Sequence, residues 1–270
     1  MQTLFLILLF IIGSCSGSFL CCQARRLHLR SASKGNHKKL GSRSVCLNCK
    51  YQLKWYDNIP VISWIFLRGK CRKCHKKIGF AEILSELGIG LAFLALGTTI
   101  NVENFIPLAW AVFISILFLV LNLGFLAIYD GLYGELPSLC LIISIICAVI
   151  ALCLKEWLIL SSSAFSLNTI LDPIASVAIL GGLYFILYFV SKGKWVGDGD
   201  WILGTAIGLA LASPWLALIT LFISNVLACL VMAPVVKKSK NKKIHFGPFM
   251  VIAFIITFTF ADFFNYTIGM

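Results

Sequence analysis

Two aspartates that are far apart in the sequence could together carry out peptide hydrolysis. Asp130 lies in AIYDGLYGELP and Asp200 in WVGDGDWILG, each at the end of an apolar stretch. A carboxylate in the hydrocarbon region of a membrane costs on the order of 3 kcal/mol or more, so each such acid is a candidate functional residue. Two neighbouring carboxylates do not both ionise easily, and one keeps a proton while the other is charged. Such a pair can serve as the general base and general acid that cleave a peptide bond.

Asp200 belongs to the string GDGD at 197–200. We expect Gly197 and Gly199 to leave room for an extended peptide beside the acid, because glycine has no side chain. The string alone is a weak signal, and it gains weight from the second aspartate at a membrane boundary, Asp130. Several other acids are interpreted as loop, connection or helix-end residues, with Asp172 capping a helix that begins at Pro173: Asp57, Glu82, Glu103, Glu156, Asp172 and Asp262.

Four of the 11 cysteines form a second chemical group. Cys46 and Cys49 in CLNC, and Cys71 and Cys74 in CRKC, lie in one polar segment. Two such pairs can close a tetrahedral zinc site, and the surrounding basic residues favour the thiolates that bind metal. A redox-active pair is the alternative. A closed four-sulfur site has no open position for chemistry, so we expect a structural zinc ion. The other cysteines, in or beside apolar segments, are interpreted as packing residues.

The elements that must position these residues are membrane helices. Of the 270 residues, 60% are hydrophobic and only 13% are charged, whereas soluble domains carry about 25% charged residues. A spanning helix needs about 20 apolar residues, and this predicts an all-α polytopic membrane protein with about eight transmembrane helices. The expected spans lie near 2–24, 82–100, 106–127, 138–158, 172–190, 201–213, 214–235 and 247–268.

The net charge of +12 is mainly a topology signal rather than a signature of nucleic-acid binding. Of the 23 Lys and Arg residues, 15 lie between Arg25 and Lys77, two in SKGK at 191–194 and five in KKSKNKK at 237–243. With eight spans these three stretches fall on one side, which the positive-inside rule makes cytoplasmic. Both termini are then outside, and Asp130 and Asp200 meet at the cytoplasmic boundary. The basic residues also favour contact with anionic membrane lipids.

The composition divides the chain into three parts. Residues 1–24 form a first transmembrane helix, interpreted as a retained anchor because Arg25 and Arg26 follow it directly. Residues 25–80 form a cytoplasmic zinc-binding loop domain, and residues 81–270 a transmembrane domain that carries both aspartates. Gly204 and Gly208 form a small-xxx-small pair, which favours close packing of the sixth helix on a neighbour.

With these motifs in place, the chain resembles the bacterial type IV prepilin leader peptidase family nearly from end to end. GSFL at 17–20 looks like the opening motif of the family. RSVCLNCKYQLKWYDNIPVISWIFLRGKCRKCHKKI at 43–78 is similar to its zinc loop. Asp130, followed by Pro137, resembles the first catalytic aspartate and its downstream Leu-Pro. GDGD resembles the GxGD motif, which makes Asp200 the second catalytic residue, and FGPF at 246–249 resembles the motif before the last helix.

This resemblance implies a GxGD aspartyl protease that removes the leader of a prepilin or pseudopilin. Cleavage would follow a glycine at the cytoplasmic face of the inner (plasma) membrane, in service of a type IV pilus, protein secretion or competence system. It also implies N-methylation of the new N-terminus from S-adenosylmethionine. Glu86 is the candidate for methyl transfer, zinc is the implied structural metal, and no nucleic-acid partner is expected.

The chain departs from the family pattern at three places. Cys21 stands where asparagine usually follows GSFL, and GFAEILSE at 79–86 keeps only Glu86 of a stretch that usually contains Arg-Tyr-Pro. His245 stands where proline usually precedes FGPF. The first two changes fall in the region associated with methyl transfer and leave the protease motifs intact. Alternative interpretations are an intramembrane protease of the presenilin or signal-peptide-peptidase type, a non-enzymatic ion-coupled transporter, and a structural scaffold.

Overall fold

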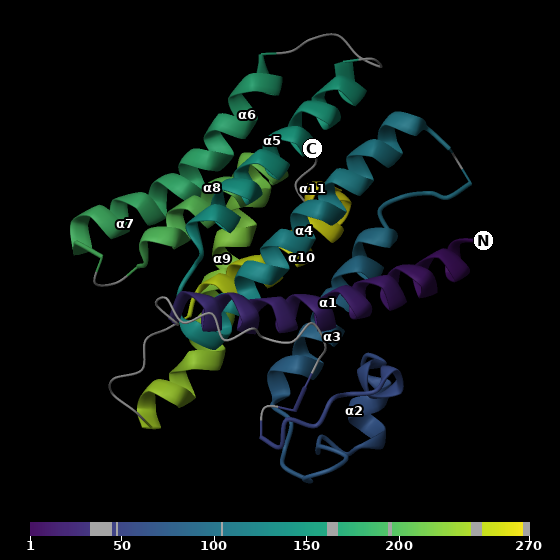
Figure 1. Ribbon diagram of the computed structural model, residues 1–270. Helices are drawn as coiled ribbons and strands as arrows, with labels where there is room; N and C mark the ends of the chain where they lie inside the picture. The colour runs from purple at the N-terminus through teal and green to yellow at the C-terminus, as the bar shows by residue number, and fades with distance from the viewer. Residues whose placement is uncertain are drawn as a thin grey trace. The chain divides into compact units, whose positions relative to one another are not determined.

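The structure of the protein is a computed structural model that describes residues 1–32, 45–46, 48–103, 105–160, 167–193, 196–238 and 245–266. Most of the predicted basic stretch 237–243 lies outside these residues. The described residues form helices and no β-strand, which confirms the predicted all-α class (Figure 1). The helices are α1 (Gln2–Ala32), η1 (Trp55–Asn58), α2 (Ile62–Phe66), α3 (Phe80–Gly97), α4 (Pro107–Tyr133), α5 (Ser138–Leu160), α6 (Asn168–Val177), η2 (Ala178–Gly182), α7 (Leu183–Ser191), α8 (Asp198–Leu211), α9 (Pro214–Lys238), α10 (Gly247–Thr259) and α11 (Ala261–Tyr266).

Six helical segments of the described chain are long and apolar enough to cross a membrane. They are Gln2–Ser31, Phe80–Gly97, Pro107–Tyr133, Ser138–Leu160, Asn168–Ser191 and Pro214–Met232. The two remaining predicted spans correspond to shorter helices, α8 with 14 residues and α10 with 13. The chain is therefore a polytopic helical protein whose shorter helices carry two of the predicted motifs, GDGD and FGPF.

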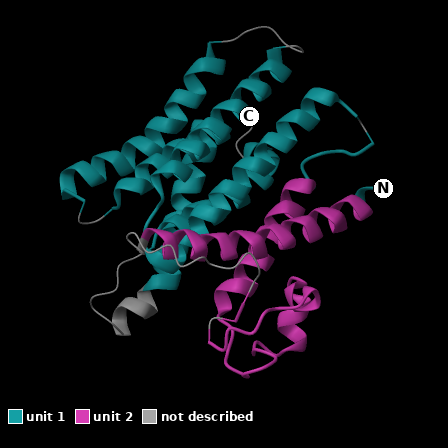
Figure 2. Cartoon of the chain, viewed as in Figure 1, with its two compact units in different colours: residues 1–2, 98–270 teal, residues 3–97 magenta. Residues whose placement is uncertain are grey.

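The chain divides into two compact units, coloured separately in Figure 2. One contains residues 3–97, with α1, the cysteine loop and α3; the other contains residues 1–2 and 98–270. Both aspartates belong to the second unit, whereas the four clustered cysteines and Glu86 belong to the first. The division into parts at 1–24, 25–80 and 81–270 stays a prediction.

Helix α8 packs against α5, α6 and η2 within the larger unit (Figure 1). Helix α8 can approach these neighbours closely because it has glycines at the contact positions. A Cβ atom at Gly204 would lie 2.9 Å from the carbonyl oxygen of Leu180, and one at Gly208 would lie 2.9 Å from that of Ser176. The predicted small-xxx-small contact of this helix is therefore confirmed, and it fixes the helix that begins with Asp198 and Asp200.

The start of the fifth predicted span differs from the expectation. Helix α6 begins at Asn168, and Pro173 lies inside it, so the prediction that Asp172 caps the helix is wrong. Proline has no N–H, so Pro173, which lies beyond the first turn of α6, removes one backbone hydrogen bond from the helix. The segment then continues through the π-helical turn η2 into α7.

A half-buried polar contact joins α4 to α5 two turns before Asp130. The side-chain amide of Asn122 donates hydrogen bonds of 2.8 Å to the Ser144 hydroxyl and to the carbonyl oxygen of Cys140. Ser144 is fully buried. In a membrane interior such bonds satisfy groups that water cannot reach, so this contact holds the end of α4 in a fixed register against α5.

In the smaller unit, α1 packs closely on α3 through small residues. A Cβ atom at Gly17 would lie 3.0 Å from the Cα of Glu86, and one at Gly13 would lie 2.8 Å from the carbonyl oxygen of Ile89. An ion pair of 2.6 Å between Arg25 and Glu82 continues the contact beyond the glycines. The GSFL motif thus lies directly beside Glu86.

Candidate active site and metal centre

Asp130 occupies the last turn of α4. The helix ends because Gly134 adopts φ +70° and returns its N–H to the Asp130 carbonyl oxygen. The Asp130 side chain is 8% exposed. One of its oxygens, Oδ2, accepts a 2.9 Å hydrogen bond from the backbone N–H of Gly247, and the other, Oδ1, lies 3.7 Å from His245 Nδ1. A backbone donor and an imidazole therefore both face this carboxyl group.

The FGPF motif supplies the backbone donor. Gly247 is the first residue of α10, where N–H groups have no partner within the helix and the helix dipole favours negative charge. A Cβ atom at this position would lie 2.9 Å from Asp130 Oδ2. Glycine is therefore required for the N–H to reach the carboxylate, which explains the motif physically.

Asp200 lies in the first turn of α8, outside the six membrane-spanning segments. Its Oδ2 accepts a 3.0 Å hydrogen bond from the backbone N–H of Gly197, and the residue is 9% exposed. Burial raises the pKa of Asp200, the Gly197 N–H opposes this effect, and the charges of Asp130 and Asp198 add to it, so that the pKa is about 6. Asp200 therefore keeps its proton to a higher pH than an ordinary aspartate.

The turn that follows α4 contacts the start of α8, where Asp200 lies. Leu136, six residues after Asp130, packs on Gly199, the neighbour of Asp200; a Cβ at Gly199 would lie 2.7 Å from Leu136 Cδ1. The electrostatic effect of Asp130 on Asp200 agrees with this contact. We expected Gly199 to admit a peptide, but Leu136 fills that space. Gly199 instead allows the turn containing Leu136 and Pro137 to pack on α8.

The raised pKa of Asp200 predicts that Asp200→Asn stabilises the fold at neutral pH. A folded-state pKa of about 6 against an ordinary value of 3.8 means that the folded chain holds the extra proton between these values. Stability falls as the pH rises through this window. Above it the penalty is roughly 3 kcal/mol, at about 1.4 kcal/mol per pKa unit. Asn retains the acceptor for Gly197 and carries no charge. Thermal unfolding in detergent should therefore show a higher melting temperature for the variant at pH 8 and little difference at pH 4.

Asp198→Asn is the matched control for this measurement. Asp198 is exposed and lies in the same helical turn as Asp200, so its replacement should change the melting temperature little at either pH. Equal melting temperatures of wild type and Asp200→Asn at pH 8 would contradict a buried, charged Asp200.

Sequence reasoning missed two side chains near the pair. His245 was noted only as a departure from the family motif, yet its ring lies beside Asp130 and over Gly134, where a Cβ would approach His245 Cε1 to 2.6 Å. Tyr184 of α7 is buried, contacts the ring of Phe246 at 5.4 Å between centroids, and accepts a 3.5 Å hydrogen bond from Asn225. Both contacts join segments distant in sequence, and no local pattern signals them.

The four clustered cysteines form two loops with the same backbone geometry. In each loop, the backbone N–H of the first cysteine donates to the carbonyl oxygen two residues after the second cysteine. These bonds run from Cys46 to Tyr51 at 2.8 Å and from Cys71 to Lys76 at 2.9 Å. The residue after each second cysteine is left-handed, Lys50 at φ 55° and His75 at φ 54°. Isolated β-bridges, Val45–Gln52 and Lys70–Lys77, close the two loops.

The four sulfur atoms fit a tetrahedral metal ion. They lie within 4.8 Å of one another, with 3.9 Å between Cys46 and Cys74 and between Cys49 and Cys71. A zinc–sulfur bond of about 2.3 Å implies sulfur–sulfur distances of about 3.8 Å in a tetrahedron. The cluster therefore could bind zinc through Cys46, Cys49, Cys71 and Cys74, the set predicted from sequence.

The thiols of the cluster differ sharply in acidity when no cation is present. The Lys76 N–H lowers the pKa of Cys74 to about 6. At Cys49 the N–H of Tyr51 is outweighed by burial and by hydrogen bonds with the other thiols, and its pKa rises to about 11. A cation removes this conflict because all four sulfurs can then be thiolates.

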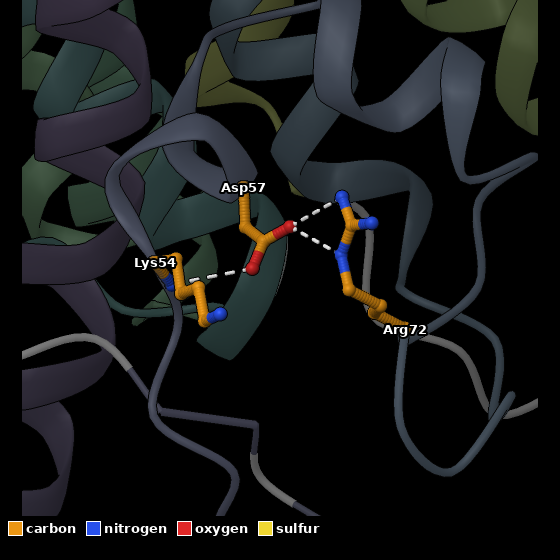
Figure 3. Close-up of polar contacts among 3 residues, drawn as sticks. All are labelled: Lys54, Asp57 and Arg72. Carbon is orange, nitrogen blue, oxygen red and sulfur yellow. Dashed lines mark hydrogen bonds and ion pairs between the residues drawn. The ribbon is translucent and has the colours of Figure 1, made fainter.

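An ion pair joins the second cysteine loop to the segment between the two loops (Figure 3). Arg72 donates from Nε to Asp57 Oδ1 at 2.8 Å, and its Nη2 lies 2.8 Å from the same oxygen. The backbone N–H of Lys54 donates to Asp57 Oδ2 at 3.2 Å. The Asp57 side chain is almost fully buried. We interpreted Asp57 as an ordinary loop acid, and its partner Arg72, 15 residues away, gave no local signal.

Glu86 lies in α3 where two other motifs converge. Its Oε2 accepts a 2.7 Å hydrogen bond from the backbone N–H of Val61, in the NIPV segment of the loop. Its carboxyl group also hydrogen-bonds Ser18 of the GSFL motif. Val61 has φ 62°, which is strained for a β-branched residue. A buried carboxylate held in this way is a candidate site separate from the two aspartates.

Comparison with known proteins gives matches along most of the chain. Residues 11–100 match the Bacterial Peptidase A24 N-terminal domain. The chain is 27% identical over 262 residues to the Prepilin leader peptidase/N-methyltransferase of Vibrio cholerae, covering 96% of this chain and 98% of that protein. It is 24% identical to the protein of that name from Pseudomonas putida, covering 96% and 91%.

A more similar but shorter match involves the Prepilin leader peptidase/N-methyltransferase of Myxococcus xanthus. Identity there is 40% over 92 residues, which is 34% of this chain and 26% of the relative. No solved structure matches the chain. The similarity of the full chain to such proteins confirms the resemblance indicated by the motifs.

Proposed function

We propose that this chain, a relative of the type IV prepilin leader peptidases, is an aspartic endopeptidase that removes the leader peptide of type IV prepilins or pseudopilins. The proposal is supported by the packing of Leu136, six residues after Asp130, on Gly199, and by the effect of the Asp130 charge on the pKa of Asp200. The names of the relatives supply the substrate class.

The surroundings of the two acids suit different roles in hydrolysis. Burial disfavours the charged form of Asp130, whereas the Gly247 N–H, and the His245 ring at 3.7 Å when it is protonated, favour the carboxylate. Asp200 is buried, and its pKa of about 6 leaves a minor fraction of molecules at neutral pH with the proton that the reaction needs. Asp130 then takes a proton from water as the water oxygen adds to the scissile carbonyl carbon. Asp200 donates its proton to the carbonyl oxygen, and the leaving nitrogen is protonated as the intermediate collapses.

The location of the reaction follows from the topology expected for the basic residues. Their positions favour a multi-pass protein of the bacterial inner membrane with the cysteine loop in the cytoplasm. A prepilin leader is basic and ends just before an apolar helix, so its scissile bond would lie at the same boundary as Asp130 and Asp200. The zinc ion, held by four thiolates, would stabilise the loop and take no part in proteolysis.

Glu86 supports a second step, N-methylation of the mature pilin. Its carboxylate is oriented by Val61 N–H and Ser18, and it could hold the new N-terminal ammonium group and accept the proton lost when nitrogen takes a methyl group. S-adenosylmethionine would supply that methyl group. Of the residues usual in this region of the family, the chain keeps Glu86, whereas Cys21 and residues 79–85 differ from the family pattern. The proposed methyl transfer therefore depends on Glu86.

Mass spectrometry of a reaction with purified protein tests both activities. A prepilin incubated with the protein in detergent should lose its leader after the glycine. With S-adenosylmethionine added, the mature N-terminus should gain the mass of one methylene group. Glu86→Gln should retain cleavage and lose this added mass, because it removes only the charge of the carboxylate.

The two outcomes separate the two parts of the proposal. An intact prepilin would overturn the peptidase assignment. A cleaved but unmodified pilin from the wild-type protein would restrict the chain to proteolysis and remove the role given to Glu86.

A further inference from the structure

Helix α2 exposes a row of apolar side chains. Ile62, Ile65 and Phe66 are 51%, 60% and 82% exposed. They are spaced by three and four residues, so they share one face of the helix. Large apolar side chains gathered on one exposed face indicate a surface that binds a partner or a membrane.

Two contacts fix α2 beside the start of α3, as Figure 1 shows. The ring of Trp64 lies 5.8 Å from that of Phe80, the first residue of α3. The Val61 N–H, immediately before α2, donates to Glu86 one turn and a half into α3. Helix α3 is one of the six segments able to cross a membrane. The exposed face of α2 is therefore tied to the point where the chain enters the bilayer.

The charges around α2 match an anionic surface. Arg68 and Lys70 follow the helix directly and are exposed. Residues 45–80 contain eight Lys and Arg against one acid, Asp57, and that acid is already paired with Arg72. Basic residues beside a membrane helix are attracted to anionic lipid headgroups. The same charges would repel a basic prepilin leader.

We propose that α2 lies in the membrane–water interface, with Ile62, Ile65 and Phe66 inserted among the lipids and Arg68 and Lys70 against anionic headgroups. An amphipathic helix with an apolar face and a basic flank binds membranes in this way. The docking holds Glu86 and the cysteine cluster at the level of the bilayer surface. It does not depend on the proposed peptidase activity.

Photocrosslinking of the full-length protein tests this placement. Phe66→p-benzoylphenylalanine is reconstituted in vesicles of phosphatidylethanolamine and phosphatidylglycerol, illuminated, and analysed by mass spectrometry. The same substitution at Phe222, which is 70% exposed in a spanning helix, is the lipid-facing reference. We expect lipid adducts at position 66 in a yield comparable to that at position 222.

A second set of crosslinking measurements tests the basic residues that follow α2. Arg68→Gln combined with Lys70→Gln should lower the lipid adducts at position 66 several-fold, and phosphatidylcholine vesicles should have the same effect. Adducts that are insensitive to both changes would overturn the role of the headgroups. Crosslinks from position 66 to residues 98–270 or to a second copy, or no adduct where position 222 gives one, would overturn the placement of α2 in the interface.

Discussion

Asp130→Asn and Asp200→Asn are each expected to lower the rate of leader cleavage by at least about 10³-fold, because each removes one partner of the acid–base pair. Asn at position 130 cannot take the proton from water. Asn at position 200 still accepts the hydrogen bond from Gly197 but has no acidic proton to donate. Initial rates of prepilin cleavage by the purified variants measure the effect.

Asp198→Asn is the matched control, since Asp198 lies two residues from Asp200 but is exposed. It should keep most of the activity. His245→Gln should lose several-fold, because it removes the imidazole beside Asp130 and leaves the Gly247 N–H in place. Wild-type rates in either Asn variant, or an inactive Asp198→Asn protein, would contradict the assignment. Melting temperatures of all variants separate loss of chemistry from loss of folding.

The parts of the site that sequence predicted are those whose pattern is local. Each pair of cysteines is held by a short loop, so CLNC and CRKC already specify the two turns that present the sulfur atoms. Gly197 and Asp200 are likewise joined within one helical turn. In such cases the spacing of the residues determines the geometry, and no distant contact is needed.

The parts that sequence did not predict depend on contacts between distant segments. Gly247 donates to Asp130 from 117 residues away, and Leu136 occupies the space beside Gly199 that we assigned to substrate. The structural role of Asp57 is apparent only from its ion pair with Arg72. No periodicity or spacing identifies such partners, because the packing of α4, α8 and α10 creates them.

Helix ends were predicted less well than helix identities, for a related reason. The apolar pattern places the third span at 106–127, whereas α4 continues to Tyr133 and ends at the left-handed Gly134. The extra turn contains Asp130 and Tyr129, and the half-buried Asn122, two turns before Asp130, contacts α5 through Ser144. A hydropathy pattern does not detect the polar end of a helix, although here this end contains the candidate catalytic residue.

Loss of the metal is expected to unfold the cysteine loop while leaving cleavage partly intact. Cys46→Ser or Cys74→Ser removes one of four ligands, and metal analysis should fall from one zinc per chain to nearly none. Structural zinc contributes on the order of 10 kcal/mol in small zinc modules, so the loop should lose its folded state. Hydrogen exchange of residues 45–78 should then become fast, whereas exchange in α4 and α8, which belong to the other unit, should change little.

Cys229→Ser is the matched control, because Cys229 is an exposed cysteine of α9 that lies outside the cluster. It should retain zinc and slow exchange. The cluster and Glu86 lie in one unit and both aspartates lie in the other. The Cys46→Ser variant should therefore lose more of its methylation activity than of its cleavage activity. A Cys46→Ser protein that keeps a full zinc content, or a metal-free wild-type protein whose loop still exchanges slowly, would show that the four sulfurs do not hold a structural metal ion.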